Sequence, residues 1–167
     1  MEGAITILDS ERAFKMLERI ACQIEENCYP EKELIILGID DKGLWLAQQL
    51  QSLLTGKISC TIESATCQDK SKDSAIVVFS ASNFPAGKTW LVVDDVLYSG
   101  RTLFITIAGL IPYSPKRILS AVLIDRGHRQ IPVSADFTGM VLATTLQEKV
   151  KVEIDISNKE IKGYLVG

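Results

Sequence analysis

The sequence predicts an α/β fold in which a mostly parallel, twisted sheet is flanked by helices. Continuous apolar runs of strand length, Leu34–Ile39 and Leu91–Val93, are typical of parallel strands that are covered on both faces. Segments with apolar residues at helical spacing alternate with such runs along the chain. The 167 residues are enough for one well-buried core and too few for two ordinary domains, so we assign residues 1–167 to a single domain.

The first half of the chain predicts two helices around the first apolar run. Asp9 or Ser10 caps a helix with one apolar stripe, which ends near Asn27 because a proline follows closely. After the strand at Leu34–Ile39, a second apolar stripe at helical spacing runs to Leu54. These helices are expected to pack against the sheet.

The middle of the chain is harder to assign. Ile58–Ile62 and Ala75–Ser80 read as strands, and the polar segment Glu63–Ser74 between them has no periodicity and reads as a loop. Leu103–Ile111 is apolar all round, so periodicity does not distinguish a helix from a strand. We predict a helix, because a parallel sheet needs a crossover before the next strand, Lys116–Ile124.

The ends of the chain predict shorter elements. Ile5–Leu8 forms a short strand, and residues 131–139 read as irregular structure. Lys149–Ile156 alternates charged and apolar residues, which indicates a half-exposed strand, and Ile161–Val166 is placed to pair back on it.

Charge and cysteine content exclude several classes of function. The 18 basic and 21 acidic residues give a formal charge of −3, so any RNA contact would need a local basic patch. The four cysteines lack the spacing of a metal site and read as reduced thiols. No signal peptide or membrane-spanning run is recognisable, so we expect a cytoplasmic protein without a membrane partner.

The most informative stretch is Leu91–Thr102, in which an apolar strand ends in the adjacent carboxylates Asp94 and Asp95. A small loop with Ser99 and Gly100 follows and leads into the apolar helix. Ligands of open α/β sheets bind at the carboxyl ends of strands, and a helix N-terminus attracts an anion. The stretch therefore predicts a sugar-phosphate site, with the acids facing hydroxyls or a metal ion. An ordinary turn is the alternative, but it would leave an acid pair beside buried valines without partners.

The run Val92–Thr102 resembles the phosphoribosyl diphosphate (PRPP) motif of type I phosphoribosyltransferases: apolar residues, two acids, three residues, Ser or Thr, Gly, any residue and Thr. Leu123–Arg129 resembles the PyrR group of that family, pyrimidine-operon attenuators that also have uracil phosphoribosyltransferase activity. The resemblance implies the type I fold, with a small hood formed by about residues 1–8 and 125–150. It implies transfer of the ribose 5-phosphate group of PRPP to uracil, giving UMP. The alternative is a regulator of pyrimidine genes that senses nucleotides or binds RNA without catalysis.

The resemblance also implies roles for individual residues. Asp94 and Asp95 would be catalytic and would hold the ribose hydroxyls and, through water, Mg²⁺. The loop for the 5′-phosphate would comprise Val96, Leu97, Tyr98, Ser99, Gly100, Arg101 and Thr102. The pyrophosphate loop would comprise Ile39, Asp40, Asp41, Lys42 and Gly43. The base pocket would comprise Ile124, Asp125, Arg126 and Gly127, and a mobile flap would carry Asp69, Lys70 and Lys72.

Two segments depart from the family pattern. The pyrophosphate loop of the PyrR group carries Thr-Arg where this chain has Asp41 and Lys42, and an added carboxylate repels a pyrophosphate. The flap lacks the aromatic residue and the arginine of the family, so Lys70 or Lys72 would serve only as a point charge. A solvated hairpin loop is the alternative for this segment. We therefore expect weak transfer activity.

The expected partners are PRPP and a nucleobase or nucleotide. RNA is the weaker expectation, because positions that are basic or hydrogen-bonding in the PyrR RNA surface are Glu18, Cys22, Ser134 and Met140 in this chain. Arg19 and Arg129 remain as basic residues there. A homodimer or a higher homo-oligomer is expected from the family, from the apolar Leu103–Ile111 and from Trp45 and Trp90, which look exposed.

Overall fold

A computed structural model describes residues 4–68, 76–143 and 148–167. Its main sheet has six strands in the order β4-β3-β2-β5-β6-β7. These are Ile76–Phe79, Ser59–Gln68, Glu33–Ile39, Thr89–Leu97, Arg117–Asp125 and Phe137–Val141. The pairs from β3 to β7 are parallel, and β4 is antiparallel to β3 at one edge. The predicted α/β class with a mostly parallel sheet is confirmed.

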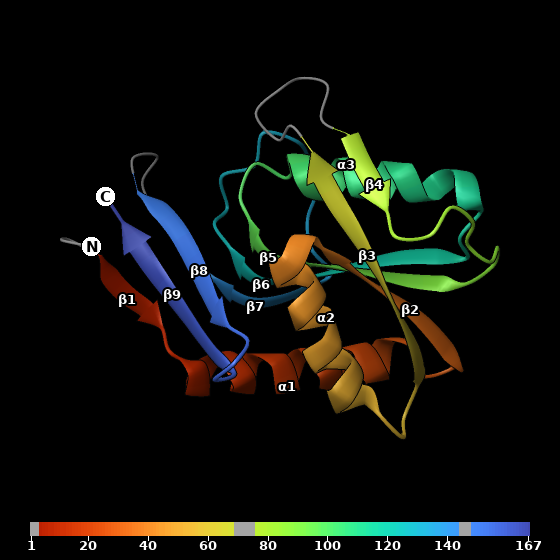
Figure 1. The fold of residues 1–167 in the computed structure, drawn as a ribbon, viewed down its shortest axis with the longest axis horizontal. Helices are drawn as coiled ribbons and strands as arrows, with labels where there is room; N and C mark the ends of the chain where they lie inside the picture. Colours follow the sequence, from red (N-terminus) through yellow and green to blue (C-terminus); the bar gives the residue numbers. More distant parts are fainter. Residues whose placement is uncertain (1–3, 69–75, 144–147) are drawn as a thin grey trace.

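Helices cover both faces of this sheet (Figure 1). α1 (Ser10–Asn27) and α2 (Asp40–Leu54) pack in one core with residues such as Ile36 of β2, and α3 (Arg101–Leu110) packs in a second core with residues such as Leu37. Neighbouring residues of a strand point to opposite faces, so a strand between two cores must be apolar throughout. This explains why the central strands read as continuous apolar runs.

The predicted helices are confirmed, including the ambiguous one. The side chain of Asp9 accepts a hydrogen bond from the backbone N–H of Arg12 at 2.9 Å and caps α1. The apolar stretch after the loop at Ser99 and Gly100 forms α3, and a short 3₁₀ helix, η1 (Ile111–Tyr113), completes the crossover to β6. No helix in the described part of the chain is long and apolar enough to cross a membrane.

A separate small sheet has the order β1-β9-β8. β1 (Ile5–Leu8) pairs antiparallel with β9 (Glu160–Val166), which pairs antiparallel with β8 (Lys149–Asp155), so the predicted pairing of the last two strands is confirmed. In Figure 1 this sheet lies beside the carboxyl end of β5. Val152 and Ile161 are buried in the same core as α1, which anchors the small sheet to the rest of the molecule.

Two segments predicted to be irregular are strands. Phe137–Val141 is β7 of the main sheet, because pairing with β6 satisfies backbone hydrogen bonds that burial of Phe137 would leave unmet. Glu63–Gln68 continues β3 and forms a hairpin with β4 instead of a loop. In this segment Ala65 and Cys67 are buried and alternate with exposed polar residues, a weak period-two pattern carried by small side chains. The predicted flap residues Asp69, Lys70 and Lys72 lie outside the described residues.

The two tryptophans contribute almost no solvent-exposed apolar surface. Trp45 and Trp90 are 5% and 0% exposed, so the prediction that they look outward is wrong. Both belong to the two cores, where their large side chains fill space between helices and sheet.

Candidate active site

The N-terminus of α2 and the end of β5 meet at the carboxyl edge of the sheet. Gly38 of β2 pairs with Val93 of β5, and a Cβ on Gly43 would lie 2.5 Å from the carbonyl oxygen of Val93. Only glycine permits this approach, because every other residue would clash with the backbone. Residues 40–43, predicted as a loop, are the first turn of α2. The approach brings Lys42 Nζ to 3.3 Å from Asp95 Oδ2.

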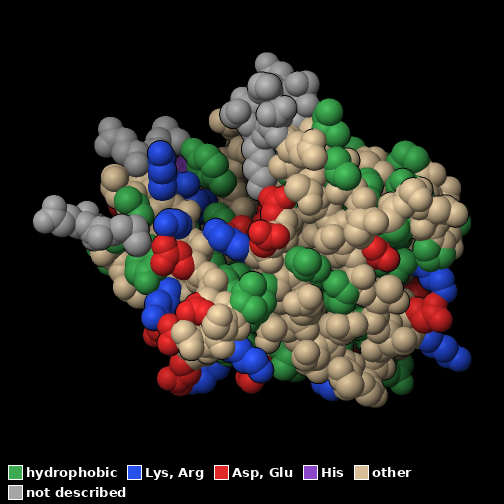
Figure 2. Space-filling view, in the orientation of Figure 1, with side chains coloured by type: hydrophobic (Ala, Val, Ile, Leu, Met, Phe, Trp, Pro, Cys, Tyr) green, Lys and Arg blue, Asp and Glu red, His purple; other side chains and the backbone are tan. Residues whose placement is uncertain are grey.

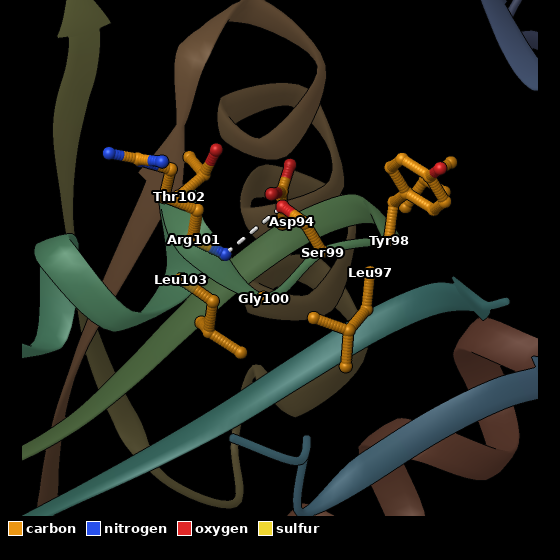
Figure 3. A pocket seen from close by; sticks show the side chains of 9 residues that line it. Asp94, Leu97, Tyr98, Ser99, Gly100, Arg101, Thr102 and Leu103 are labelled. Carbon is orange, nitrogen blue, oxygen red and sulfur yellow. Dashed lines mark hydrogen bonds between the residues drawn. The ribbon is translucent and has the colours of Figure 1, made fainter. Parts of the chain in front are cut away.

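The loop between β5 and α3 surrounds a cavity of about 210 Å³, lined by Asp94 and the residues from Val96 to Leu103 (Figure 3). Gly100, at φ 81°, turns the chain into α3, and Ser99 Oγ accepts a hydrogen bond from the N–H of Arg101 at 3.3 Å. The side chains of Asp94, Ser99 and Thr102 point to one side of this loop in Figure 3. We call this cavity the phosphate-loop cavity. Its hydroxyls and helix N-terminus suit a single phosphate group.

The two adjacent acids serve different cavities. Asp94 Oδ1 accepts a hydrogen bond from the N–H of Asp95, and Asp95 Oδ1 accepts one from the N–H of Val96, both at 2.9 Å. Asp94 lines the phosphate-loop cavity, whereas Asp95 lines a second cavity with Lys42. The sequence analysis predicts one common site for the two acids, whereas in the structure each acid lines a different cavity.

The second cavity lies between the main sheet and the small sheet and measures about 380 Å³. We call it the hood cleft. It is lined by Lys42, Asp95, Val96, Tyr98, Arg126, Glu148, Lys149, Val150, Lys151 and Val152. Figure 2 shows basic side chains gathered where the small sheet meets the body of the molecule, with acidic side chains close to them. Sequence reasoning missed the contribution of β8, although its alternating Lys and Val residues are a signal for a charged face.

Arg126 connects the phosphate loop to the hood cleft. It is only 5% exposed, and its guanidinium lies 4.4 Å from the ring centroid of Tyr98. It also donates a hydrogen bond to the backbone carbonyl of Glu148, and its own backbone N–H donates to the carbonyl of Leu97 at 3.0 Å. On the other side, the His128 ring lies edge-on to Tyr98 at 6.3 Å between centroids. The Arg126 side chain thus links the turn after β6, the loop at Tyr98 and the backbone at Glu148.

The other residues of the predicted base pocket have mainly structural surroundings. Ile124 is fully buried in the core. Asp125, 4% exposed, accepts a hydrogen bond from the N–H of Gly127 at 2.8 Å and pairs with Arg129. These contacts shape the turn after β6, and they engage the backbone N–H groups of Arg126 and Gly127 within the protein.

The predicted pyrophosphate loop is divided among different environments. Ile39 is buried, and Asp40 Oδ1 accepts a hydrogen bond from the N–H of Cys67 at 3.0 Å, which ties α2 to β3. Asp41 is exposed, and Gly43 packs on β5. Of these five residues, Lys42 is the one whose side chain lines the hood cleft.

The fold and the two cavities define the class of protein. A parallel sheet that ends in paired acids beside a loop and a helix N-terminus is the arrangement expected of a ligand site in an open α/β sheet. The Phosphoribosyl transferase domain family matches residues 4–155. The chain therefore belongs to the phosphoribosyltransferase family. More particularly, it is 34% identical to Bifunctional protein PyrR of Macrococcus caseolyticus, over 95% of this chain and 97% of the relative. It is 36% identical to Bifunctional protein PyrR of Brevibacillus brevis, over 89% and 88% of the two chains. The predicted resemblance to the PyrR group is confirmed.

Solved structures agree on the fold. A hypoxanthine-guanine phosphoribosyltransferase from Bacillus anthracis superposes with a TM-score of 0.77, 20% identity and coverage of 96% of this chain and 97% of that one. A hypoxanthine phosphoribosyl transferase from Trypanosoma cruzi gives 0.78, 17% identity and coverage of 96% and 91%. At these identities the likeness concerns the fold alone.

Proposed function

We propose that the protein transfers the ribose 5-phosphate group of PRPP to uracil, forming UMP and pyrophosphate. The observation that carries the proposal is the position of Asp94 and Asp95 between the phosphate-loop cavity and the hood cleft. A ribose held by these acids would place its 5′-phosphate in the first cavity and its reacting C1 toward the second. The curated relatives named Bifunctional protein PyrR support uracil as the base.

The reaction breaks the C1–O bond between ribose and pyrophosphate while N1 of uracil attacks C1 and loses its proton to solvent. Positive charge develops on the sugar, and the carboxylates of Asp94 and Asp95 stabilise it while they accept hydrogen bonds from the ribose hydroxyls. Backbone N–H groups at the N-terminus of α3, with Ser99 and Thr102, hold the 5′-phosphate. Arg126 orients the wall of the hood cleft by stacking on Tyr98. The protein acts mainly by positioning and charge.

Magnesium is the proposed cofactor, and the donor set suits an ion shared with the substrate. Two neighbouring carboxylates are hard oxygen ligands of the kind Mg²⁺ prefers. Among the described residues no three or more His, Cys, Asp or Glu side chains are grouped so that they could hold a metal ion. Asp94 and Asp95 are the residues that would hold Mg²⁺, through water. When bound, Mg²⁺ supplies electrostatic stabilisation of the departing pyrophosphate.

The test is incubation of the protein with PRPP, Mg²⁺ and labelled uracil. UMP should form slowly, and Thr102→Val should reduce its formation because a phosphate ligand is lost, while free uracil binding is spared. Absence of UMP at high protein concentration would reject the enzymatic proposal. Saturable binding of PRPP or UMP by calorimetry in the same preparation would then identify a nucleotide sensor.

A role as an RNA-binding regulator is the second candidate, favoured by the word bifunctional in the names of the relatives. Its two expected basic contacts have other partners. The Arg19 guanidinium donates hydrogen bonds to the backbone carbonyls of Thr138 and Gly139, and Arg129 pairs with Asp125. A gel shift with pyrimidine leader RNA that stays empty even at low salt would reject this role.

We also infer that the protein forms a homodimer or a higher homo-oligomer. The support that remains after burial of the tryptophans is the exposed apolar surface of Phe104 and Ile111 at α3 and η1, 48% and 62% exposed. Sedimentation that gives only monomer at micromolar concentration would overturn this.

A further inference from the structure

We propose that the small sheet supplies the cations that hold the diphosphate group of PRPP, namely Lys149 and Lys151 of β8, acting with Lys42 across the hood cleft. This inference rests on the proposed function. It adds β8 to the segments, the pyrophosphate loop and the flap, for which the family resemblance implies contact with the pyrophosphate.

The charge of the cleft favours an anion. Its lining has four basic residues and two acidic ones, Lys42, Arg126, Lys149 and Lys151 against Asp95 and Glu148. Arg126 is engaged with the Tyr98 ring and the carbonyl of Glu148, which leaves the three lysines for a ligand. Uracil is neutral, whereas a diphosphate carries the charge that several ammonium groups in a confined cleft would attract.

The geometry of β8 places two of these lysines on one face. Val150 and Val152 alternate with them and pack onto the core, Val152 being 1% exposed. Lys149 and Lys151 are therefore exposed on the opposite face, and both also line the cleft. The side-chain ammonium of Lys149 has no hydrogen-bond or ion-pair partner among residues 4–68, 76–143 and 148–167. An ammonium group without a partner at the mouth of a cavity is ready to meet an anion.

The other two lysines contact carboxylates that an anion would replace. Lys42 Nζ lies 3.3 Å from Asp95 Oδ2, and Lys151 Nζ lies 2.8 Å from Glu153 Oε1. The hydrogen bond from Lys151 holds the pKa of Glu153 below its usual value, and the charge of Lys42 lowers it further. Lys42 and β8 are therefore electrostatically linked across the cleft. A diphosphate between them would accept hydrogen bonds from both sides.

The departures in the pyrophosphate loop make such a contribution necessary. The first turn of α2 carries Asp40 and Asp41, whose charges oppose an anion at that helix N-terminus. The phosphate-loop cavity, at about 210 Å³, is the smaller of the two sites. With the 5′-phosphate there and the ribose at the acids, the cations of β8 are the compensating charge for the second anionic end of PRPP.

The experiment compares a ligand with both the 5′-phosphate and the diphosphate, one with the diphosphate alone and one with the 5′-phosphate alone. Binding of PRPP, pyrophosphate and UMP, each with Mg²⁺, is measured by calorimetry for the wild type and for Lys149→Gln, Lys151→Gln and the double variant. We expect PRPP and pyrophosphate affinity to fall about fivefold for each single variant and about twentyfold or more for the double variant. UMP affinity should stay within about twofold, because UMP lacks the diphosphate. Melting temperatures report on folding.

Two controls separate charge from structure. Lys162→Gln removes an ammonium group of similar exposure from β9, where it pairs with Glu160 at 2.6 Å, and should leave all three ligands unaffected. The double Lys→Arg variant keeps both charges and should retain PRPP affinity.

The outcomes distinguish the inference from the function on which it rests. Unchanged PRPP affinity in the double variant would overturn the inference while UMP formation upheld the function. Equal loss of UMP and PRPP affinity would also overturn it, because the lysines would then act on the whole site. If the double variant lost PRPP affinity while the wild type formed no UMP, catalysis would be rejected and the inference kept. A wild type that bound no PRPP would overturn both.

Discussion

The phosphate-loop cavity and the hood cleft are built in opposite ways. The first is lined by one nearly continuous segment, from Asp94 to Leu103, which begins on β5 and ends on α3. The second is assembled from α2, the end of β5, the turn after β6 and β8, and its lining spans residues 42 to 152. The first therefore depends on backbone conformation, and the second on where long side chains meet.

This difference explains where the chain keeps the family pattern and where it departs from it. A contiguous loop that binds through backbone N–H groups needs its glycine and its helix start, so few alternatives preserve it. An assembled cleft binds through charge, and an ammonium group can be supplied from any wall. A lysine at position 42, where the PyrR group has an arginine, would still permit diphosphate binding if β8 provides other cations.

The largest expected effect comes from Gly100→Ala, which breaks the loop. The residue has φ 81°, and its Cβ would lie 2.6 Å from Val133 Cγ1, so backbone strain and crowding act together. We expect a loss of about 2–4 kcal/mol in the free energy of unfolding. Affinity for UMP and PRPP should fall about a hundredfold or more, since several charge-assisted hydrogen bonds are lost.

Gly87→Ala is the matched control for this change. Gly87 has φ 72° with no atom near the added Cβ, so it isolates the backbone strain. It should cost about 1 kcal/mol and leave ligand binding intact. Chemical denaturation and calorimetry measure both effects, and equal effects at the two glycines would show that the loop does not bind phosphate.

Asp94→Asn is expected to weaken binding of PRPP with Mg²⁺ by about ten- to a hundredfold, because a charged partner of the ribose and the metal is lost. The melting temperature of the ligand-free protein should stay the same or rise, since neighbouring carboxylates repel each other. Asp95→Asn should not raise it, because Lys42 loses its partner. Lower melting with normal nucleotide binding in Asp94→Asn would make the pair structural.

Arg126→Met tests whether the two cavities are coupled. The variant loses the stacking on Tyr98 and the hydrogen bond to the carbonyl of Glu148, at a cost of about 1–3 kcal/mol in stability. We expect weaker PRPP binding but ribose 5-phosphate affinity within about threefold of the wild type, because ribose 5-phosphate lacks the diphosphate that would lie in the hood cleft. Arg126→Lys, which keeps the charge without the planar group, should behave like Arg126→Met. Normal PRPP affinity in both variants would show that the cavities are independent.

The smallest expected effect is a gain in Glu153→Gln. Removing the carboxylate beside Lys151 should raise PRPP affinity about two- to threefold at low ionic strength, and high salt should abolish the gain. The pKa of Glu153 lies below its usual value of 4.5, so this carboxylate stays charged at neutral pH. The wild type should therefore show no such gain between about pH 8 and pH 6 in a titration of PRPP affinity. Unchanged affinity in the variant would indicate that Lys151 does not meet the ligand.

The sequence by itself determined the α/β class and the order of the main helices and strands. It also identified the segment from Asp94 to Thr102 as the candidate ligand-binding loop. Each of these depends on neighbouring residues: apolar runs for strands covered on both faces, stripes at helical spacing, and a contiguous motif at a strand end. Local patterns fail where the signal is weak. Examples are residues 63–68, which are predicted to belong to a loop, and residues 137–139, which are predicted to be irregular, since both segments lie in strands.

Only the tertiary structure decided how distant segments meet at the site. It joined residues 5–8 to residues 160–166 in the small sheet, separated the surroundings of Asp94 from those of Asp95, and brought Lys42 close to β8. The physical reason is that these contacts depend on strand register and on close packing at Gly43, which act between residues far apart in the chain. Periodicity reports which face of an element is buried, but not which element covers that face.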